Sequence, residues 1–285
     1  MAATLAITGS TGELGARVAR RLAARGVEQR LIVRDAGRAP ELEGAEVAVA
    51  SSYRAEDEMR AALEGARTLY FVSGREEADR LEQHRTVVRA AKAAGVERIG
   101  YVSCMRAAED HTFTLGRQHW ATEQAIRDAG MAFTFLRSSL YMDFVPFFAG
   151  EDRVIRGPAG QGRYPPVTRD DLADCAVAVL TSGGAHDGRT YELTGPELLT
   201  LGEIAERMST YTGQEYRYED ETIEEAWASR RPSGAPDWEL EGWISSYVAI
   251  ADGSFDVLTD DVERLSGHRP QTLEECLDAH PDLLA

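Results

Sequence analysis

The stretch with the clearest chemistry is Gly9-Ser10-Thr11-Gly12-Glu13-Leu14-Gly15, in which three glycines recur at intervals of three residues. It follows a short apolar segment, residues 4–7, and Leu14, Val18 and Leu22 then repeat as on one face of a helix. A strand, a glycine loop and a helix in this order direct unpaired backbone N–H groups and the positive end of the helix dipole at one spot. The loop is therefore predicted to bind the pyrophosphate of a dinucleotide. The alternative is a turn that merely joins a strand to a helix.

Further binding residues are expected where other strands end. In open α/β sheets the ligand lies beyond the carboxyl ends of the strands, at the point where the strand order reverses. The residues that directly follow the next apolar segments are thus predicted to complete the cofactor site. They are Arg34, Ser52, Tyr53, Ser73, Gly74 and Arg75.

The end of the second predicted strand, Arg34-Asp35, bears on the type of nicotinamide cofactor. An acid at this place binds the ribose 2′-hydroxyl of NAD, whereas a guanidinium pairs with the 2′-phosphate of NADP. Arg34 comes directly after the apolar segment, so the sequence favours NADP(H). In the alternative, Arg34 only forms a surface ion pair.

Short apolar segments alternate with helical patterns along the first two thirds of the chain. This alternation predicts an α/β fold, a doubly wound parallel Rossmann sheet with helices on both faces. Strands are predicted at residues 4–7, 30–33, 46–50, 68–72, 99–103, 132–136 and 190–194. Helices are predicted from the glycine loop to about residue 26 and at 56–63, 77–94, 120–129 and 168–179.

After residue 140 the alternation of apolar segments and helical patterns becomes less regular. Residues 150–166 are rich in glycine and proline and predict a loop. Capping boxes then predict three helices, at Thr200 with Glu203, Thr222 with Glu225 and Thr272 with Glu275. The predicted domains are a Rossmann domain at 1–194, with an excursion at 141–166 towards the pocket, and a smaller, mostly helical substrate lobe at 195–285.

Several strings resemble one known family. The spacing G-x-x-G-x-x-G and the string ITGSTGELG resemble the opening of NmrA-like atypical short-chain dehydrogenase/reductases. The strings VRD, FVSG, AAKAAGV, YVS, ATEQAIRDAG and LRSSLYM are similar to those of type-2 NADPH:quinone oxidoreductases, and the likeness covers most of the chain. It departs from the family pattern at Ser138 and at Ser51-Ser52. The resemblance implies an NADP(H)-dependent oxidoreductase.

The catalytic dyad of ordinary short-chain reductases, Tyr-x-x-x-Lys, is absent. Lys92 is the only lysine, it precedes the fifth predicted strand, and Val88 stands four residues before it. Matching the family pattern puts Leu115 at the tyrosine position and His119 at the lysine position. A dyad-free site still suits quinones, because their reduction gives a phenolate-type anion with a pKa of about 10, which water can protonate.

Three residues are candidate catalytic groups. Ser103 matches the serine that ends strand five, His119 belongs to the residue type used most often as a proton donor, and Tyr141 follows strand six near the expected nicotinamide. For His119 the alternative is a hydrogen-bonded residue at a helix N-terminus with no chemical role. For Tyr141 and the aromatic residues after it, the alternative is core packing.

The sequence thus predicts an NADPH-dependent reductase of quinones or related conjugated carbonyl or aromatic small molecules. A second hypothesis is a non-catalytic NADP(H)-binding redox sensor of the NmrA-like type, which would also lack the dyad. A third is a fold adapted to non-redox chemistry, with a structural cofactor.

Composition limits the partners. The formal net charge is −17, with 48 acidic and 31 basic residues, which disfavours nucleic acid and anionic membranes. The three scattered cysteines exclude a disulfide framework and, with histidines that form no ligand motif, predict no metal. No run approaches the length of a membrane span, so a cytoplasmic protein is expected, and a homodimer is compatible with the sequence.

Overall fold

The computed structural model describes residues 4–284. These residues group into two compact units, each made of several chain segments. The first comprises the described residues up to Ser103 together with Gln118–Arg137 and Arg169–Tyr191. The second comprises Cys104–Arg117, Ser138–Thr168 and the described residues from Glu192 onwards. The predicted division into domains 1–194 and 195–285 stays a prediction.

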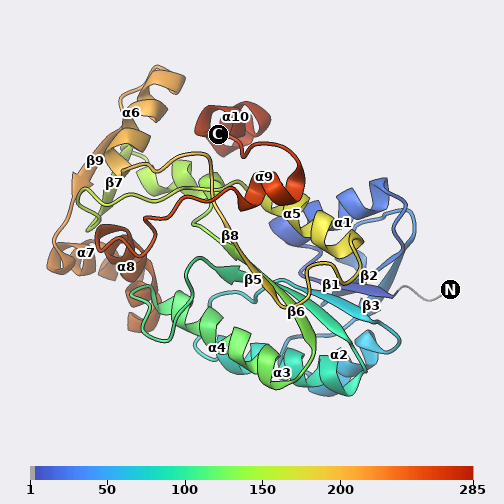
Figure 1. Ribbon diagram of the computed structural model, residues 1–285. Coiled ribbons are helices and arrows are strands. Elements are labelled where there is room, and N and C mark those ends of the chain that lie inside the picture. Colours follow the sequence, from blue (N-terminus) through green and yellow to red (C-terminus); the bar gives the residue numbers. More distant parts are fainter. Residues whose placement is uncertain (1–3, 285) are drawn as a thin grey trace. The chain divides into compact units, whose positions relative to one another are not determined.

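A seven-stranded sheet in the order β3-β2-β1-β4-β5-β6-β8 forms the centre of the fold (Figure 1). The pairings of β1 with β2 and β4, of β2 with β3 and of β4 with β5 are all parallel. The strands are β1 Leu5–Thr8, β2 Gln29–Val33, β3 Ala45–Val49, β4 Thr68–Phe71, β5 Arg98–Cys104, β6 Ala132–Ser138 and β8 Arg189–Leu193. Strand order reverses between β1 and β4, so the loops after these two strands flank the switch point.

Helices cover both faces of this sheet, with α1 and α5 on one side and α2, α3 and α4 on the other (Figure 1). They are α1 Glu13–Ala24, α2 Glu56–Leu63, α3 Arg80–Ala93, α4 Thr114–Asp128 and α5 Arg169–Thr181, with the short 3₁₀ helix η1 at Ala36–Arg38. A buried cluster that includes Leu69, Phe71, Val87, Ile99 and Phe135 fills the space under α2, α3 and α4. The predicted doubly wound Rossmann fold is confirmed.

The second unit is mostly helical. Its elements are η2 Met142–Ala149, β7 Val154–Gly157, α6 Leu201–Thr212, β9 Arg217–Asp220, α7 Ile223–Arg230, η3 Arg231–Ser233, α8 Asp237–Ala251, α9 Asp261–Ser266, α10 Leu273–Ala279 and η4 Pro281–Leu284. All three predicted capping boxes are present, and they begin α6, α7 and α10. Within residues 4–284, no helix has the length and apolar character needed to cross a bilayer.

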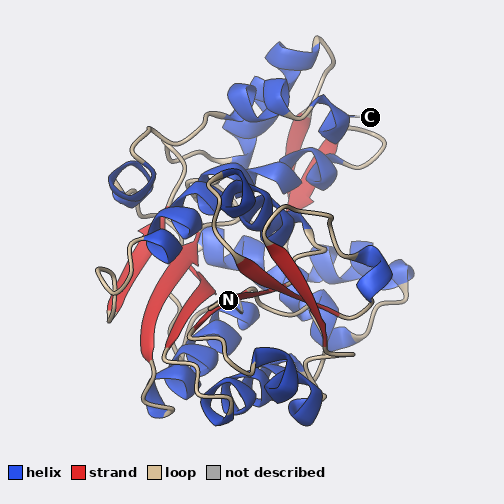
Figure 2. Ribbon diagram, turned by 90° about the vertical axis from the view of Figure 1, so that its right-hand side faces the viewer, coloured by secondary structure: helices blue, strands red, loops and turns tan. Residues whose placement is uncertain are grey.

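Two local predictions were wrong. Residues 150–166 were predicted as loop, yet they contain β7, which pairs in parallel with β9 as a separate two-stranded sheet (Figure 2). Each strand has only four residues, too short to show alternation, and glycines and prolines flank β7. Helix α4 begins at Thr114, six residues before its predicted start, because the helix accommodates Gly116 in its first turn.

Candidate functional site

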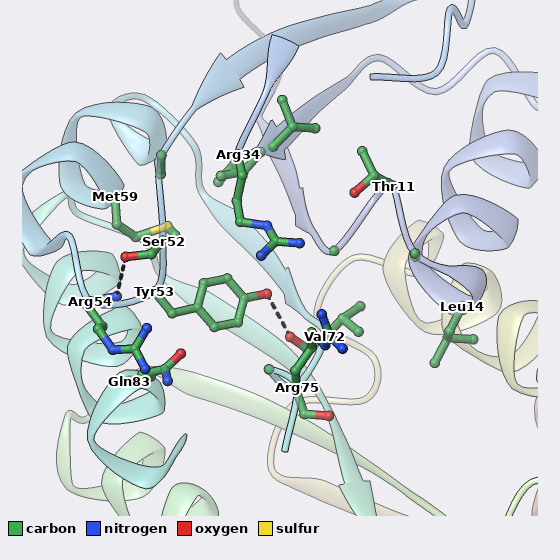
Figure 3. A pocket seen from close by; sticks show the side chains of 18 of the residues that line it. Thr11, Leu14, Arg34, Ser52, Tyr53, Arg54, Met59, Val72, Arg75 and Gln83 are labelled. Carbon is green, nitrogen blue, oxygen red and sulfur yellow. Dashed lines mark hydrogen bonds between the residues drawn. The ribbon is translucent and has the colours of Figure 1, made fainter. Parts of the chain in front are cut away.

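A cavity of about 310 Å³ lies at the carboxyl ends of β1 to β4, within the first unit. The loops that follow these four strands supply its walls (Figure 3). The predicted cofactor residues that line it are Gly9, Thr11, Gly12, Glu13, Leu14, Gly15, Arg34, Ser52, Tyr53, Ser73, Gly74 and Arg75. Ser10 is not in the lining, and its side chain is fully buried. The binding roles of all these residues stay predictions.

The glycine loop has the geometry of a phosphate cradle. Gly9 has a φ of +66°, and the Gly12 N–H donates to its carbonyl at 2.9 Å, which closes a tight turn. At Gly15 a Cβ atom would lie 2.3 Å from the Gly9 carbonyl oxygen, so only glycine lets α1 approach β1 this closely. The N-terminus of α1 consequently faces the cavity, with its positive dipole end towards an incoming phosphate.

Glu13 introduces a negative charge beside this cradle. It is the first residue of α1 and lines the cavity, with a side chain 73% exposed. Its carboxylate pairs with Arg17 one turn later, at 2.7 Å. A carboxylate at this position stabilises the free helix N-terminus and, for the same electrostatic reason, opposes a bound pyrophosphate.

Glu13→Gln is therefore expected to tighten NADPH binding about two- to fivefold at low salt while lowering the unfolding free energy by about 0.5 kcal/mol. Fluorescence titration at two ionic strengths measures the first effect, and chemical denaturation measures the second. Glu28→Gln, at an exposed position outside the cavity lining, is the matched control. Unchanged or weaker binding by the Glu13 variant would contradict this electrostatic role.

The second strand end separates the roles of Arg34 and Asp35. Arg34 lines the cavity, and Figure 3 shows its guanidinium directed between Tyr53 and the loop that carries Thr11. The Asp35 carboxylate instead accepts the Gly37 N–H at 3.0 Å and caps η1. Within residues 4–284 neither Arg34 nor Arg38, a further lining residue, belongs to an ion pair. Two guanidiniums are thus left for an anion, and no carboxylate from this strand end lines the cavity.

Tyr53 joins two walls of the cavity. Its hydroxyl donates to the Val72 carbonyl at 2.9 Å, so the loops after β3 and β4 are linked through it (Figure 3). Burial raises the pKa of Tyr53 to about 12, which keeps the hydroxyl protonated and able to donate at neutral pH. Next to it, Arg54 pairs with Glu77 and with Asp79. Hydrogen bonds from Gln83 and then from Arg54 lower the pKa of Glu77, and hydrogen bonds from Arg54 and then from Gln83 lower the pKa of Asp79.

Sequence reasoning missed several lining residues. Arg38, Arg54, Met59, Glu77 and Gln83 lie beyond the strand ends, in η1, α2, α3 and the segments before them. A local signal existed for Arg38, since Asp35 with Gly37 is typical of a side-chain-capped turn that folds the chain back towards Arg34. Gln83 had no comparable signal, because its place in the wall depends on how α3 packs.

The predicted catalytic residues are not in the cavity lining. Ser103 is buried, and its hydroxyl donates to a Glu123 carboxylate oxygen at 2.6 Å. Arg137 also binds the fully buried Glu123, at 2.8 Å from Nε and 2.7 Å from a terminal nitrogen. The Glu123 carboxylate thus accepts a hydrogen bond from a hydroxyl and two from a guanidinium, which compensates its charge inside the protein.

His119 and Tyr141 have different surroundings. His119 is buried, with Nδ1 2.8 Å from the Tyr101 hydroxyl and Nε2 3.1 Å from an Arg80 nitrogen. Both of its ring nitrogens are thus engaged, which favours the non-chemical alternative for this residue. Tyr141 belongs to the second unit, where it stacks on Phe144 with ring centroids 5.9 Å apart. In the described part of the chain, no three His, Cys, Asp or Glu side chains cluster as metal ligands would.

Comparison with known proteins gives both a family and close relatives. The model of the NAD(P)H-binding family matches residues 9–183. Quinone oxidoreductase 2 of Escherichia coli is 32% identical over 277 residues, which cover 95% of this chain and 96% of that protein. The NAD(P)H azoreductase of Xenophilus azovorans is 28% identical, with 96% of each chain covered.

Solved structures of reductases match this chain over nearly its whole length. The E. coli quinone oxidoreductase in complex with NADPH superposes with a TM-score of 0.88 over 96% of this chain and 99% of its own. The triphenylmethane reductase of Citrobacter sp. complexed with NADP(H) is 32% identical, with a TM-score of 0.85 over 96% and 99% of the two chains. The resemblance stated from the sequence is confirmed. The chain belongs to the NAD(P)H-binding family and is an NAD(P)H-dependent oxidoreductase.

Proposed function

We propose that this protein is an NADPH-dependent reductase of quinones and of similarly electron-poor conjugated molecules such as azo and triarylmethane dyes. Support comes from the strand-end cavity and from relatives named for quinone, azo-dye and triphenylmethane reduction. Bound in the cavity, NADPH would supply a hydride from its nicotinamide ring. The glycine loop would hold its pyrophosphate, and Arg34 and Arg38 would pair with its 2′-phosphate.

The preference for NADPH over NADH rests on the second strand end. Two guanidiniums line the cavity there, whereas the neighbouring carboxylate of Asp35 caps its own backbone turn and does not line the cavity. The 2′-hydroxyl of NADH would find no acceptor among these groups, whereas a 2′-phosphate would find two cations. The relative of known structure that binds NADPH supports the same choice.

The observation that carries the choice of acceptor is the hydrogen bond that Ser103 donates to Glu123. A hydroxyl has one proton, and here a buried carboxylate holds it, so Ser103 is poorly placed to protonate an alkoxide. The chain also lacks the Tyr-x-x-x-Lys dyad. Ketone reduction would suffer from both features, whereas the phenolate-type anion of a reduced quinone, with a pKa of about 10, takes its proton from water.

Stopped-flow mixing of the NADPH-loaded protein with a panel of acceptors tests the proposal. We expect benzoquinones, naphthoquinones, an azo dye and a triarylmethane dye to oxidise bound NADPH faster than free NADPH, and cyclohexanone to leave it unreacted. NADPH binding with no acceleration by any acceptor would refute the reductase and leave the sensor hypothesis. Efficient cyclohexanone reduction would refute the argument from Ser103 and the missing dyad.

The substrate-facing residues of this reductase are a further part of the proposal. We place substrate contacts in the smaller lobe, 195–285, and at Tyr141, where the sequence predicts them. Replacement of Tyr141 by phenylalanine in the same assay separates a donor role from a wall, because phenylalanine keeps the ring and removes the proton.

A further inference from the structure

A buried polar network lies behind the cavity wall, entirely within the first unit. Its members come from α3, β5 and α4, and they meet the loop after β4 at one residue, Gly74. This loop is outside regular secondary structure, and Ser73, Gly74 and Arg75 line the cavity. The network therefore connects the protein interior to a wall that the cofactor would touch.

Both backbone groups of Gly74 are held by side chains of α3. The Gly74 N–H donates to His84 Nε2 at 2.9 Å, and Arg80 Nε donates to the Gly74 carbonyl at 2.9 Å. A Cβ at Gly74 would lie 3.3 Å from the Tyr53 ring and 3.5 Å from His84 Nε2. Gly74 is thus fixed by two hydrogen bonds and packed between two rings.

The hydrogen bonds define the tautomer of His84. Because Nε2 accepts the Gly74 N–H, the ring proton must be on Nδ1, which donates to Thr122 Oγ1 at 2.9 Å. The Thr122 hydroxyl in turn donates to the backbone carbonyl of Gln118 at 2.8 Å. Burial, and secondarily Arg80, hold the pKa of His84 well below its ordinary value, so the ring is neutral and the acceptor is available.

Arg80 is held in turn by α4. Its terminal nitrogens contact Gln118 Oε1 and His119 Nε2, both at 3.1 Å, and since a guanidinium can only donate, His119 Nε2 accepts. His119 Nδ1 then meets the Tyr101 hydroxyl of β5. Arg80 is only 3% exposed. A side chain this deeply buried and this fully bonded has one orientation, and that orientation places the Gly74 carbonyl.

We propose that Arg80 and His84 are positioning residues for NADP(H), which fix the Gly74 peptide in the cavity wall, and that His119 acts through Arg80 in the same network. The proposal rests on the proposed function, because it assumes that the cofactor occupies this cavity. It gives His119 a role in cofactor binding that acts through Arg80. In this proposal His84 acts as a hydrogen-bond acceptor through the lone pair on Nε2, and not as a proton donor.

A pair of substitutions at His84 tests the acceptor. Glutamine can place its side-chain oxygen where Nε2 lies, whereas leucine fills similar space with no acceptor. We expect His84→Leu to raise the Kd for NADPH about tenfold, with a smaller effect on kcat at saturating NADPH, and His84→Gln to stay within about twofold of the wild type. His186→Gln is the matched control, since His186 bonds Tyr191 and is outside the cavity lining.

The pH dependence supplies a readout that packing alone would not change. The titratable groups that the contacts place around His84 are Arg80 on its own helix, the Tyr101 hydroxyl 3.4 Å away on β5, and His119 beyond it. Protonation of His84 removes its acceptor, so wild-type NADPH affinity should fall at pH values below the ordinary histidine range. The 2′-phosphate titrates in the same way with both proteins. Its effect therefore cancels when the wild-type Kd at each pH is divided by the Kd of His84→Gln.

The outcomes separate the two proposals. If the wild type binds NADPH and His84→Leu raises the Kd while His84→Gln does not, the positioning role is supported. If folded His84→Leu keeps wild-type affinity, or if His84→Gln shows the same acid limb as the wild type, the positioning role is overturned and the reductase stands. If the wild type itself does not bind NADPH, the proposed function has failed first.

Discussion

Substitution of alanine for Gly15 is expected to remove measurable NADPH binding. The added methyl carbon would lie 2.3 Å from the Gly9 carbonyl oxygen and 2.6 Å from its carbonyl carbon, both backbone atoms of the phosphate loop. A flexible side chain could move away, but here α1 must shift from β1 or the loop must open. Either change displaces the N–H groups that would face the pyrophosphate, so we expect at least about a hundredfold rise in Kd.

Gly202→Ala is the matched control for this substitution. Gly202 lies in the first turn of α6, where a Cβ would find its nearest contact at 3.8 Å, and alanine favours the helix there. It should leave NADPH binding unchanged and the melting temperature equal or slightly higher. Isothermal titration with both variants, after circular dichroism shows that each is folded, gives the comparison. A Gly15→Ala protein that is folded and binds NADPH within threefold of the wild type would contradict the close-approach argument.

The parts of the fold that sequence could predict are those set by local chemistry. Each capping box is a reciprocal pair of hydrogen bonds within four residues, and all three predicted ones begin helices. The central strands are buried on both faces, so they are apolar runs that separate clearly from the helices between them. The pair β7 and β9 depends on partners about sixty residues apart and had no local signature.

The residues of the candidate site likewise fall into those that the sequence could predict and those that depend on tertiary packing. The residues directly after β1 to β4 were predicted because parallel topology brings strand ends together whatever their side chains are. Arg80 and His84 were not assigned to the site, since each acts through the backbone of Gly74, a partner identified only by the packing of α3. The sequence shows that a histidine is present. Only the structure shows which of its ring nitrogens accepts a hydrogen bond, and from which donor.

The largest change in cofactor preference is expected from replacing Arg34 and Arg38 together by alanine. Each guanidinium lines the cavity without an ion pair in the described part of the chain, so little else would depend on it. A charge-assisted hydrogen bond to phosphate contributes about 1.5–3 kcal/mol, so loss of both should raise the Kd for NADPH by about a hundredfold or more. The Kd for NADH, which has no 2′-phosphate, should change less than about threefold.

Three comparisons make this result specific to the 2′-phosphate. Arg60→Ala removes an exposed arginine of α2 outside the lining, and it should affect neither cofactor. The wild-type Kd for NADPH should rise steeply with salt, whereas the Kd of the double variant should rise less steeply, because two of the screened charges have been removed. Equal losses for NADH and NADPH would mean that the two arginines support the loop rather than bind phosphate. Arg34 would then be structural, and the cavity would discriminate between the cofactors by some other group.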